Sequence, residues 1–340
     1  MSEAAPVGDE RPATGTARRT VVHLRKAVRF AVRYVAGYFE PGRFAPGRSP
    51  KLSLETTNIC NAKCVFCANP VMTRRKQPLD MEAFCKAVDE FAAMGGTDID
   101  FNATIGDPLL DPRLLERARY VRRHPQFANL GFVTTLQWLH RFPLDDFFAA
   151  GFTWLAVSTT LSGRERYHEF FGVDLYDRML ANLVALLEEN NRRGRPIHVA
   201  ISIKPTNEPL ARVIAHPDLE RIARLTDQDL AATVRSQGFY VDDWLGAVTL
   251  PSYLKKRPLY PRSFRPCRLL YAGLMVYSNG NVGACSCRDF EATSELILGN
   301  VKDATLGDLW TGDTLARLRE DWRRRNRVPD ICRSCRHYLY

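Results

Sequence analysis

The stretch that decides the fold is Thr57-Asn58-Ile59-Cys60-Asn61-Ala62-Lys63-Cys64-Val65-Phe66-Cys67, in which three cysteines have the spacing C-x3-C-x2-C. It follows the segment Leu52 to Thr56, which we expect to be the first strand. A loop this short can wrap three thiolates around three irons of a four-iron cluster and leave the fourth iron without a protein ligand. An open position is what a chemically active metal site requires, whereas a structural site is closed.

A zinc site is the alternative for these three cysteines, with a distant fourth ligand. No histidine lies near the loop, and zinc ligands usually come in paired C-x2-C motifs. The spacing therefore favours an iron-sulfur cluster.

The chain has nine cysteines in 340 residues. Besides the three at the front, five gather near the C-terminus: Cys267, Cys285, Cys287, Cys332 and Cys335. Cys85 stands apart in a helical pattern, where a buried small hydrophobe is expected. Met1 to Gly15 lacks the apolar segment of a secretory signal, so we predict a cytoplasmic protein whose clustered cysteines bind metal rather than form disulfides.

The net charge of +10 favours an acidic partner, a phosphate-bearing substrate or an anionic lipid surface. Outside the first fifty residues and the stretch from Arg317 to Arg336 the charges are mixed, and no basic-aromatic module interrupts them. Nucleic acid is therefore not expected as a partner. No run of about 18 apolar residues is present, which excludes a membrane-spanning helix.

The first fifty residues divide into a disordered tail, 1–19, and a segment, 20–50, with a basic amphipathic helix and a linker rich in Pro and Gly. The helix is predicted from Thr20 to Phe39, because apolar residues recur at helical spacing. It either packs on the main domain or lies on an anionic membrane as a peripheral contact.

From Lys51 to about Asp243 strands and helices alternate, which implies a parallel α/β sheet, either open or curved into a partial barrel. The expected strands are Leu52 to Thr56, Asp98 to Ala103, Leu130 to Thr134, Trp154 to Thr159, His198 to Ile203 and Thr233 to Gln237. The expected helices are Met81 to Met94, Pro112 to Arg123, Leu144 to Ala150, Tyr176 to Arg193 and Leu210 to Arg224. Reactive groups in such folds lie at the carboxyl ends of the strands, and the front cysteines follow the first strand.

The remainder, 244–340, has a different character. Two apolar runs, Leu270 to Tyr277 and Val282 to Cys287, flank Ser278-Asn279-Gly280-Asn281, which predicts a hairpin. A helix from Thr314 to Arg324 and the pair Cys332-x2-Cys335 close the chain.

The front motif, with Phe66 just before its third cysteine, resembles the radical S-adenosylmethionine superfamily. The resemblance implies a partial (β/α)6 TIM-type barrel over 51–243. It also implies that Cys60, Cys64 and Cys67 hold a 4Fe-4S cluster whose open iron chelates S-adenosylmethionine. One electron then cleaves this cofactor, and the resulting 5'-deoxyadenosyl radical abstracts hydrogen from substrate.

A second segment, Thr104 to Leu110, is similar to the family's Gly-Gly-Glu-Pro motif, which binds the methionyl ammonium. Ile105 replaces the first Gly and Asp107 replaces Glu, so the resemblance implies cofactor contacts at Gly106 and Asp107. The alternative for this segment is a turn after a strand without a role in cofactor binding. Ser158 and Thr159 match the strand end where the family contacts the ribose or carboxylate of the cofactor.

The back cysteines resemble the twitch form of the SPASM domain, a small α+β unit expected over 244–340. The spacing fits the pattern of that domain: twelve residues separate Cys267 from Gly280, four separate Gly280 from Cys285, and Cys332-x2-Cys335 follows after a gap. The resemblance implies one auxiliary 4Fe-4S cluster held by these four cysteines, with a zinc ribbon as the alternative. Cys287 is surplus: it is an inert thiol, an alternative ligand or a hydrogen-atom donor.

Enzymes similar to this chain include the aminocyclitol and sugar dehydrogenases of antibiotic biosynthesis. The resemblance implies an oxidoreductase that oxidises a hydroxyl-bearing carbon of a small substrate, with a flavodoxin or ferredoxin-type electron donor. Lys204, Asp107 and Arg235 are candidates for the base on position only.

Three other functions stay open: a redox-neutral epimerase with Cys287 as catalytic hydrogen donor, a peptide-modifying enzyme, and a zinc or cluster-binding scaffold without activity. We see no N-terminal winged-helix domain of the kind that binds leader peptides.

Overall fold

The structure is a computed structural model, and it describes residues 28, 32, 51–236, 240–259, 261, 262, 264, 266–285 and 288–338. The predicted tail and nearly all of the predicted N-terminal helix lie outside these residues. Val28 and Val32 have helical backbone and exposed side chains. Cys287 also lies outside the described residues, so its role stays a prediction. No helix in the described part of the chain has the length and apolar character needed to cross a bilayer.

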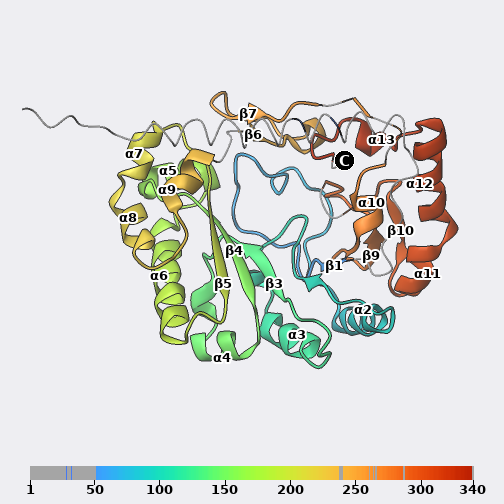
Figure 1. Cartoon of the computed structure of the whole chain (residues 1–340), viewed down its shortest axis with the longest axis horizontal. Coiled ribbons are helices and arrows are strands. Elements are labelled where there is room, and N and C mark those ends of the chain that lie inside the picture. The colour runs from blue at the N-terminus through green and yellow to red at the C-terminus, as the bar shows by residue number, and fades with distance from the viewer. Residues whose placement is uncertain are drawn as a thin grey trace, which may run out of the picture.

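The N-terminal two thirds form the predicted curved sheet of parallel strands (Figure 1). Its strands are β1 (Lys51–Leu54), β2 (Ile99–Asp100), β3 (Gly131–Thr134), β4 (Trp154–Thr159) and β5 (His198–Ile203). β1 pairs with β2, and β3, β4 and β5 pair in order. Between the two groups the backbone N–H of Phe101 donates to the carbonyl of Gly131 at 3.0 Å, so the wall continues from β2 to β3.

Helices cover the convex outer side of this wall (Figure 1). They are α2 (Met81–Ala93), α3 (Leu114–Val121), α4 (Leu144–Ala149), α5 (Gly163–Phe171), α6 (Tyr176–Arg192), α7 (Leu210–Ile214) and α8 (Pro217–Ala223), with two 3-10 turns, η1 (Pro108–Leu110) and η2 (Leu139–Arg141). The first four predicted helices are confirmed. The predicted helix from Leu210 to Arg224 is instead two helices, because Pro217 starts a new one, and α5 was not predicted.

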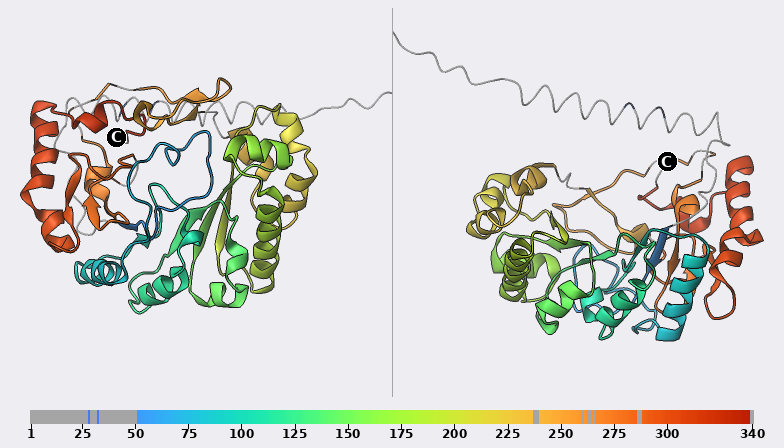
Figure 2. Two further views of the ribbon diagram at one scale, coloured as in Figure 1. Left: turned by 180° about the vertical axis from the view of Figure 1, so that it is seen from behind. Right: turned by 60° about the horizontal axis from the view of Figure 1, so that its bottom comes forward.

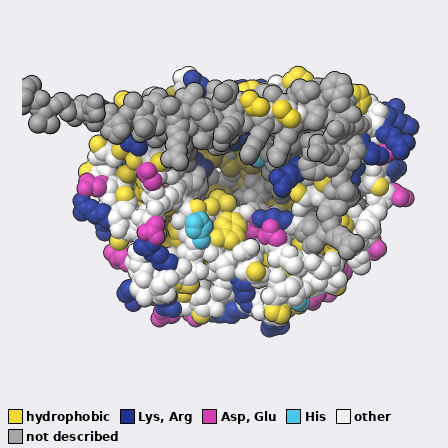
Figure 3. Space-filling view, in the orientation of Figure 1, with side chains coloured by type: hydrophobic (Ala, Val, Ile, Leu, Met, Phe, Trp, Pro, Cys, Tyr) yellow, Lys and Arg dark blue, Asp and Glu magenta, His cyan; other side chains and the backbone are white. Residues whose placement is uncertain are grey.

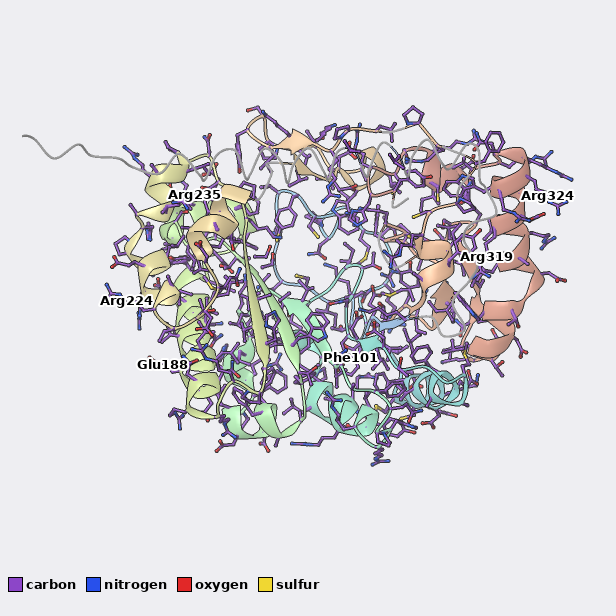
Figure 4. The ribbon with its side chains drawn as sticks, viewed as in Figure 1. Phe101, Glu188, Arg224, Arg235, Arg319 and Arg324 are labelled. Carbon is purple, nitrogen blue, oxygen red and sulfur yellow. The ribbon has the colours of Figure 1, made fainter. Side chains whose placement is uncertain are left out.

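The predicted sixth strand, Thr233 to Gln237, is wrong. Residues Leu230–Ser236 form the helix α9, and the side chain of Asp229 accepts a hydrogen bond from the backbone N–H of Ala232 at 2.7 Å. An acidic residue at a helix start satisfies free backbone donors, and this effect outweighs the β-branched pair Thr233-Val234. Arg235 is therefore exposed on the helix α9, where Figure 4 labels it, and is not a base at a strand end.

The C-terminal part continues the same sheet rather than forming a separate one. β8 (Gly273–Val276) pairs in parallel with β1, and the predicted hairpin joins β8 to β9 (Asn281–Gly283), with φ +85° at Gly280. The strand order is therefore β10-β9-β8-β1-β2. Remaining elements are η3 (Trp244–Gly246), α10 (Leu269–Ala272), β10 (Ile297–Asn300), α11 (Leu306–Thr311), α12 (Asp313–Arg325), α13 (Asp330–Arg333) and a small pair, β6 (Tyr240–Val241) with β7 (Lys255–Lys256). Figure 2 shows α11 and α12 at the end of the molecule opposite α6–α8.

The inner face of the barrel wall carries small side chains. Along β4, Leu155, Val157 and Thr159 are buried under the helices, while the alternate residues, Ala156 and Ser158, are partly exposed. In register with Ala156 lie Ala200 on β5 and Val133 on β3, whose side chain is 44% exposed. Small, half-exposed residues on the concave side leave space inside the curve of the sheet.

Candidate functional site

The three front cysteines lie together on the loop that leaves β1. Cys64 is buried, and the thiols of Cys60 and Cys67 are close enough to raise its pKa further above the value that burial produces. Burial, helped by the carboxylate of Asp107, raises the pKa of the Cys60 thiol to about 12. Desolvated thiols of this kind become thiolates only beside a cation, so the loop suits a metal cluster.

Three asparagines hold this loop in shape. Asn58, fully buried, accepts a hydrogen bond from the backbone N–H of Gln77 (2.6 Å) and donates one to the carbonyl of Arg75 (2.8 Å). Asn61 bridges the side chains of Gln137 and Trp138 at 2.7 and 2.8 Å.

The third, Asn69, acts next to the cysteines themselves. Its side chain donates to the carbonyl of Ala62 at 2.7 Å, and its backbone N–H lies 3.4 Å from the sulfur of Cys67. A backbone N–H aimed at a ligand sulfur is one of the features that tune iron-sulfur sites.

The end of α5 supports the same loop from the barrel side. The backbone N–H groups of Lys63 and Val65 donate to the carbonyls of Phe171 and Phe170 at 2.9 and 3.0 Å. The ring of Phe66 lies 4.9 Å from that of Phe170. The aromatic residue before the third cysteine therefore anchors the loop to a helix that was not predicted.

The segment resembling Gly-Gly-Glu-Pro packs directly against the cysteine loop. Gly106 has φ +137°, and a Cβ there would lie 2.2 Å from the carbonyl oxygen of Thr57, so the glycine is needed for close approach. Ile105, which replaces the family's first Gly, fills an apolar cluster with Ala68 and Trp244. The departure thus adds a packing contact between the loop and the C-terminal part.

The carboxylate of Asp107 is engaged by the protein itself. One carboxylate oxygen accepts from the backbone N–H of Leu109 (3.1 Å) and the hydroxyl of Thr134 (2.7 Å). The other accepts from the backbone N–H and hydroxyl of Thr135, at 2.9 and 2.7 Å. A carboxylate has about four acceptor positions, and all four are used. Asp107 thus ties its loop to the end of β3, and its expected contact with an ammonium group stays a prediction.

Of the two hydroxyl residues predicted at the end of β4, the structure places one at the inner face. Ser158 is in register with Ser202 of β5, and both are partly exposed on the concave side. Thr159 is fully buried on the other face, and its hydroxyl donates to the carbonyl of Thr160 and contacts the sulfur of Met179. Thr159 is thus excluded from the inner face by the alternation of a strand.

Lys204 follows β5 at the same end of the wall. Its ammonium group donates to the hydroxyl of Ser202 at 3.0 Å, and no carboxylate pairs with it among the described residues. Burial lowers the pKa of Lys204, while the nearby thiol of Cys64 acts in the opposite direction. The structure thus brings Lys204 near the front cysteines as expected, with its charge available to an anionic group.

The four predicted back ligands also meet. Cys267, Cys285, Cys332 and Cys335 line one cavity together with Trp322, His337 and Tyr338. Burial raises the pKa of the Cys332 thiol, and each of the other three thiols raises it further. The guanidinium of Arg262 lies over the ring of Tyr338 and donates to the backbone carbonyl of Cys332 at 3.0 Å.

In the described part of the chain, no three His, Cys, Asp or Glu side chains converge on the position of one ion. In a cuboidal cluster each thiolate binds a different iron, so the sulfurs stay apart.

One buried ion pair of the barrel, which also contacts the C-terminal part, was missed in the sequence. Arg74 pairs with Glu55, at the end of β1, at 2.6 Å. Glu55 also accepts the backbone N–H of Ser278, and Glu291 accepts the backbone N–H groups of Thr73 and Arg74 at 2.7 and 2.8 Å. The charged Glu55 beside an apolar strand was the available signal.

The partial barrel, the cysteine loop at its rim and the second cysteine set define an iron-sulfur enzyme of the radical type. The chain belongs to the radical SAM superfamily, whose family model matches residues 54–224. A second model, SPASM, the iron-sulfur cluster-binding domain, matches residues 267–336. Membership implies 4Fe-4S clusters, one of them auxiliary, and S-adenosylmethionine as cofactor.

Among curated proteins, the chain is similar to the PqqA peptide cyclase of Xanthomonas campestris pv. campestris (strain 8004). The two are 24% identical, over 84% of this chain and 79% of the relative. Similar relatives occur in Xanthomonas euvesicatoria pv. vesicatoria (strain 85-10), at 22% identity and with 84% and 80% covered.

Two solved structures share the fold. BtrN in complex with AdoMet and 2-DOIA has a TM-score of 0.56 and 16% identity, over 86% of this chain and 94% of that chain. Streptococcus suis SuiB bound to precursor peptide SuiA has a TM-score of 0.58 and 13% identity, over 99% of this chain and 80% of that chain.

Proposed function

We propose that this radical SAM enzyme modifies a peptide by abstracting a hydrogen atom from it. One observation carries the proposal: curated relatives named as peptide cyclases match across 84% of the chain. The comparisons thus support the peptide-modifying alternative better than our expectation of sugar or aminocyclitol oxidation.

In this proposal Cys60, Cys64 and Cys67 hold the cluster that binds S-adenosylmethionine, and Cys267, Cys285, Cys332 and Cys335 hold the auxiliary cluster. When bound, the first cluster and its cofactor supply a 5'-deoxyadenosyl radical.

The chain's own residues shape the site and face the expected cofactor. Gly106 allows the neighbouring turn to reach the cysteine loop, and Asp107 fixes that turn to β3. Ser158 and Ser202 present hydroxyls on the inner wall, where S-adenosylmethionine is expected. Lys204 offers a positive charge there that suits a carboxylate of the cofactor or the peptide.

The substrate class can be tested without knowing the substrate. An extract of the source organism grown in perdeuterated medium is separated into a peptide fraction and a fraction of small metabolites, and each is incubated with reduced, reconstituted enzyme and S-adenosylmethionine. We expect deuterium in 5'-deoxyadenosine from the peptide fraction, and none after protease treatment of that fraction. Deuterium transfer from the small-metabolite fraction alone would overturn the proposal.

A second candidate is oxidation of a hydroxyl-bearing carbon of a small molecule. It is favoured by the number of back ligands, since the four cysteines that line the cavity suffice for one auxiliary cluster. A single acceptor near the substrate is what a net two-electron oxidation requires. The small-metabolite fraction would then deliver the deuterium, and its product would be three mass units lighter than the deuterated substrate, because a carbon-bound deuterium and the hydroxyl proton are both lost.

A further inference from the structure

Between the two cysteine sets lies a short chain of contacts that neither motif includes. It starts at the indole of Trp244, whose Nε1–H donates to the carbonyl of Phe66, one residue before Cys67, at 2.8 Å. The guanidinium of Arg288 lies 4.6 Å from the centre of the indole ring, and Phe290 packs edge-on against the same ring at 6.0 Å.

From Arg288 the contacts continue to the back set. Its Nη2 lies 3.5 Å from Nδ1 of His337, and the backbone N–H of His337 donates to the sulfur of Cys335 at 3.3 Å. Arg288 thus lies between a ligand position of each set.

One carboxylate faces Arg288 directly. Asp242, whose side chain is 5% exposed, lies 2.8 Å from Nε of Arg288 and also accepts the backbone N–H of Trp244. The next residue, Asp243, faces Lys256 and Arg336 at 3.3 and 3.2 Å. Charges of both signs therefore lie next to the back set, with Arg262 on its other side.

We propose that Arg288, held by Trp244 and Asp242, is a positioning residue shared by both cluster sites, whose fixed positive charge raises the reduction potential of each cluster. The inference rests on the proposed assignment of the seven cysteines to two clusters. A reduced cluster is more negative than an oxidised one, so a nearby cation stabilises the reduced form.

The test is a redox titration of reconstituted full-length protein, followed by electron paramagnetic resonance without substrate. Arg288→Met is expected to shift both reduction equilibria about tenfold toward the oxidised form, which is about 59 mV for one electron. Arg288→Lys should keep most of the potential, and Asp242→Asn should shift the equilibria the opposite way. Arg319→Met is the control, because Arg319 is also stacked on an aromatic ring, that of Trp310, but on the α10 side (Figure 4).

Iron content identifies variants in which both clusters are intact. If Arg288→Met takes up less iron, the shift in Asp242→Asn carries the test. Unchanged potentials in fully loaded Arg288→Met and Asp242→Asn, or shifts of the same sign in both, would overturn the inference. Because no substrate is present, that result would leave the proposed peptide modification unaffected.

Discussion

The two cysteine sets are built in opposite ways. The front set lies on one short loop, which is held by the side chains of Asn58, Asn61 and Asn69 and by the backbone of α5. The back set takes its cysteines from three separate segments, and the sheet continuing from β1 through β8 to β9 brings them together.

Their electrostatic surroundings differ as well. Asp107 acts on the front thiols, and its charge opposes their ionisation. At Cys335 of the back set, the carboxylate of Asp242 opposes ionisation, while the guanidinium groups of Arg288 and Arg262 favour it. Figure 3 shows that basic side chains also gather on the surface at this end, over α12.

The largest expected effect separates the two sets directly. Replacement of Cys60, Cys64 and Cys67 by Ala should abolish reductive cleavage of S-adenosylmethionine, because the open iron would be lost. The measurement is 5'-deoxyadenosine formed by the reduced protein. Cys85→Ala, outside both sets, is the matched control and should retain activity. Cleavage by the triple variant would refute the assignment of the front loop.

A smaller, selective loss is expected from the back set. Cys332→Ala should impair turnover of the substrate to its modified product more than cleavage of S-adenosylmethionine, because the auxiliary cluster is proposed to act after hydrogen abstraction. Both rates are measured on protein whose circular dichroism matches the parent. Equal loss of the two rates would mean that the back cluster is structural or is the route of electron entry.

The hydrogen bonds of Asn58 next to the front loop give a third comparison between the two sets. Asn58→Ala removes two hydrogen bonds from a fully buried side chain and should lower the free energy of unfolding by about 2 kcal/mol. It should also speed iron loss from the front site under a chelator. Asn191→Ala is the control, because Asn191 lies near the end of α6 and its side-chain amide donates to the carbonyl of Leu225, outside the front loop. Equal rates of iron loss in the two variants would show that Asn58 does not support the loop.

Lys204 provides the smallest expected effect and one that depends on pH. Burial holds its pKa in the folded chain below the unfolded value of about 10.4, so the charge is destabilising at neutral pH, and the penalty fades as pH rises from the folded pKa toward 10.4. Lys204→Met should therefore raise the melting temperature by about 2 °C at pH 7, and by less at pH 10. Lys255→Met, at an exposed position, should change neither value. A lower melting temperature at pH 7 would show that the charge is stabilised by a partner.

Features of this molecule that depend on local spacing could be predicted from the sequence, and those that depend on distant contacts could not. The cysteine motifs, the strands β4 and β5 and the turn at Gly280 follow from local spacing and were predicted. The roles of Asp107 and Thr159 were not, because each depends on which way a side chain points and on what it meets across the fold. The pairing of β8 with β1 joins residues more than 200 positions apart, and no local pattern predicts it. No local pattern predicts the Glu55–Arg74 ion pair either.

The failed sixth strand has a different cause. The β-branched pair Thr233-Val234 favours a strand, but Asp229 followed by Leu230, Ala231 and Ala232 is a helix start. The capping bond to Ala232 decides between them.

The central claim is that the chain holds two separate iron-sulfur clusters, one on each cysteine set. Iron and acid-labile sulfide counted in anaerobically reconstituted full-length protein test it most directly. We expect about eight irons in the parent, about four in the variant lacking Cys60, Cys64 and Cys67, and about four in the variant lacking Cys267, Cys285, Cys332 and Cys335. Full iron content in either variant, or zinc in place of iron in the parent, would contradict it.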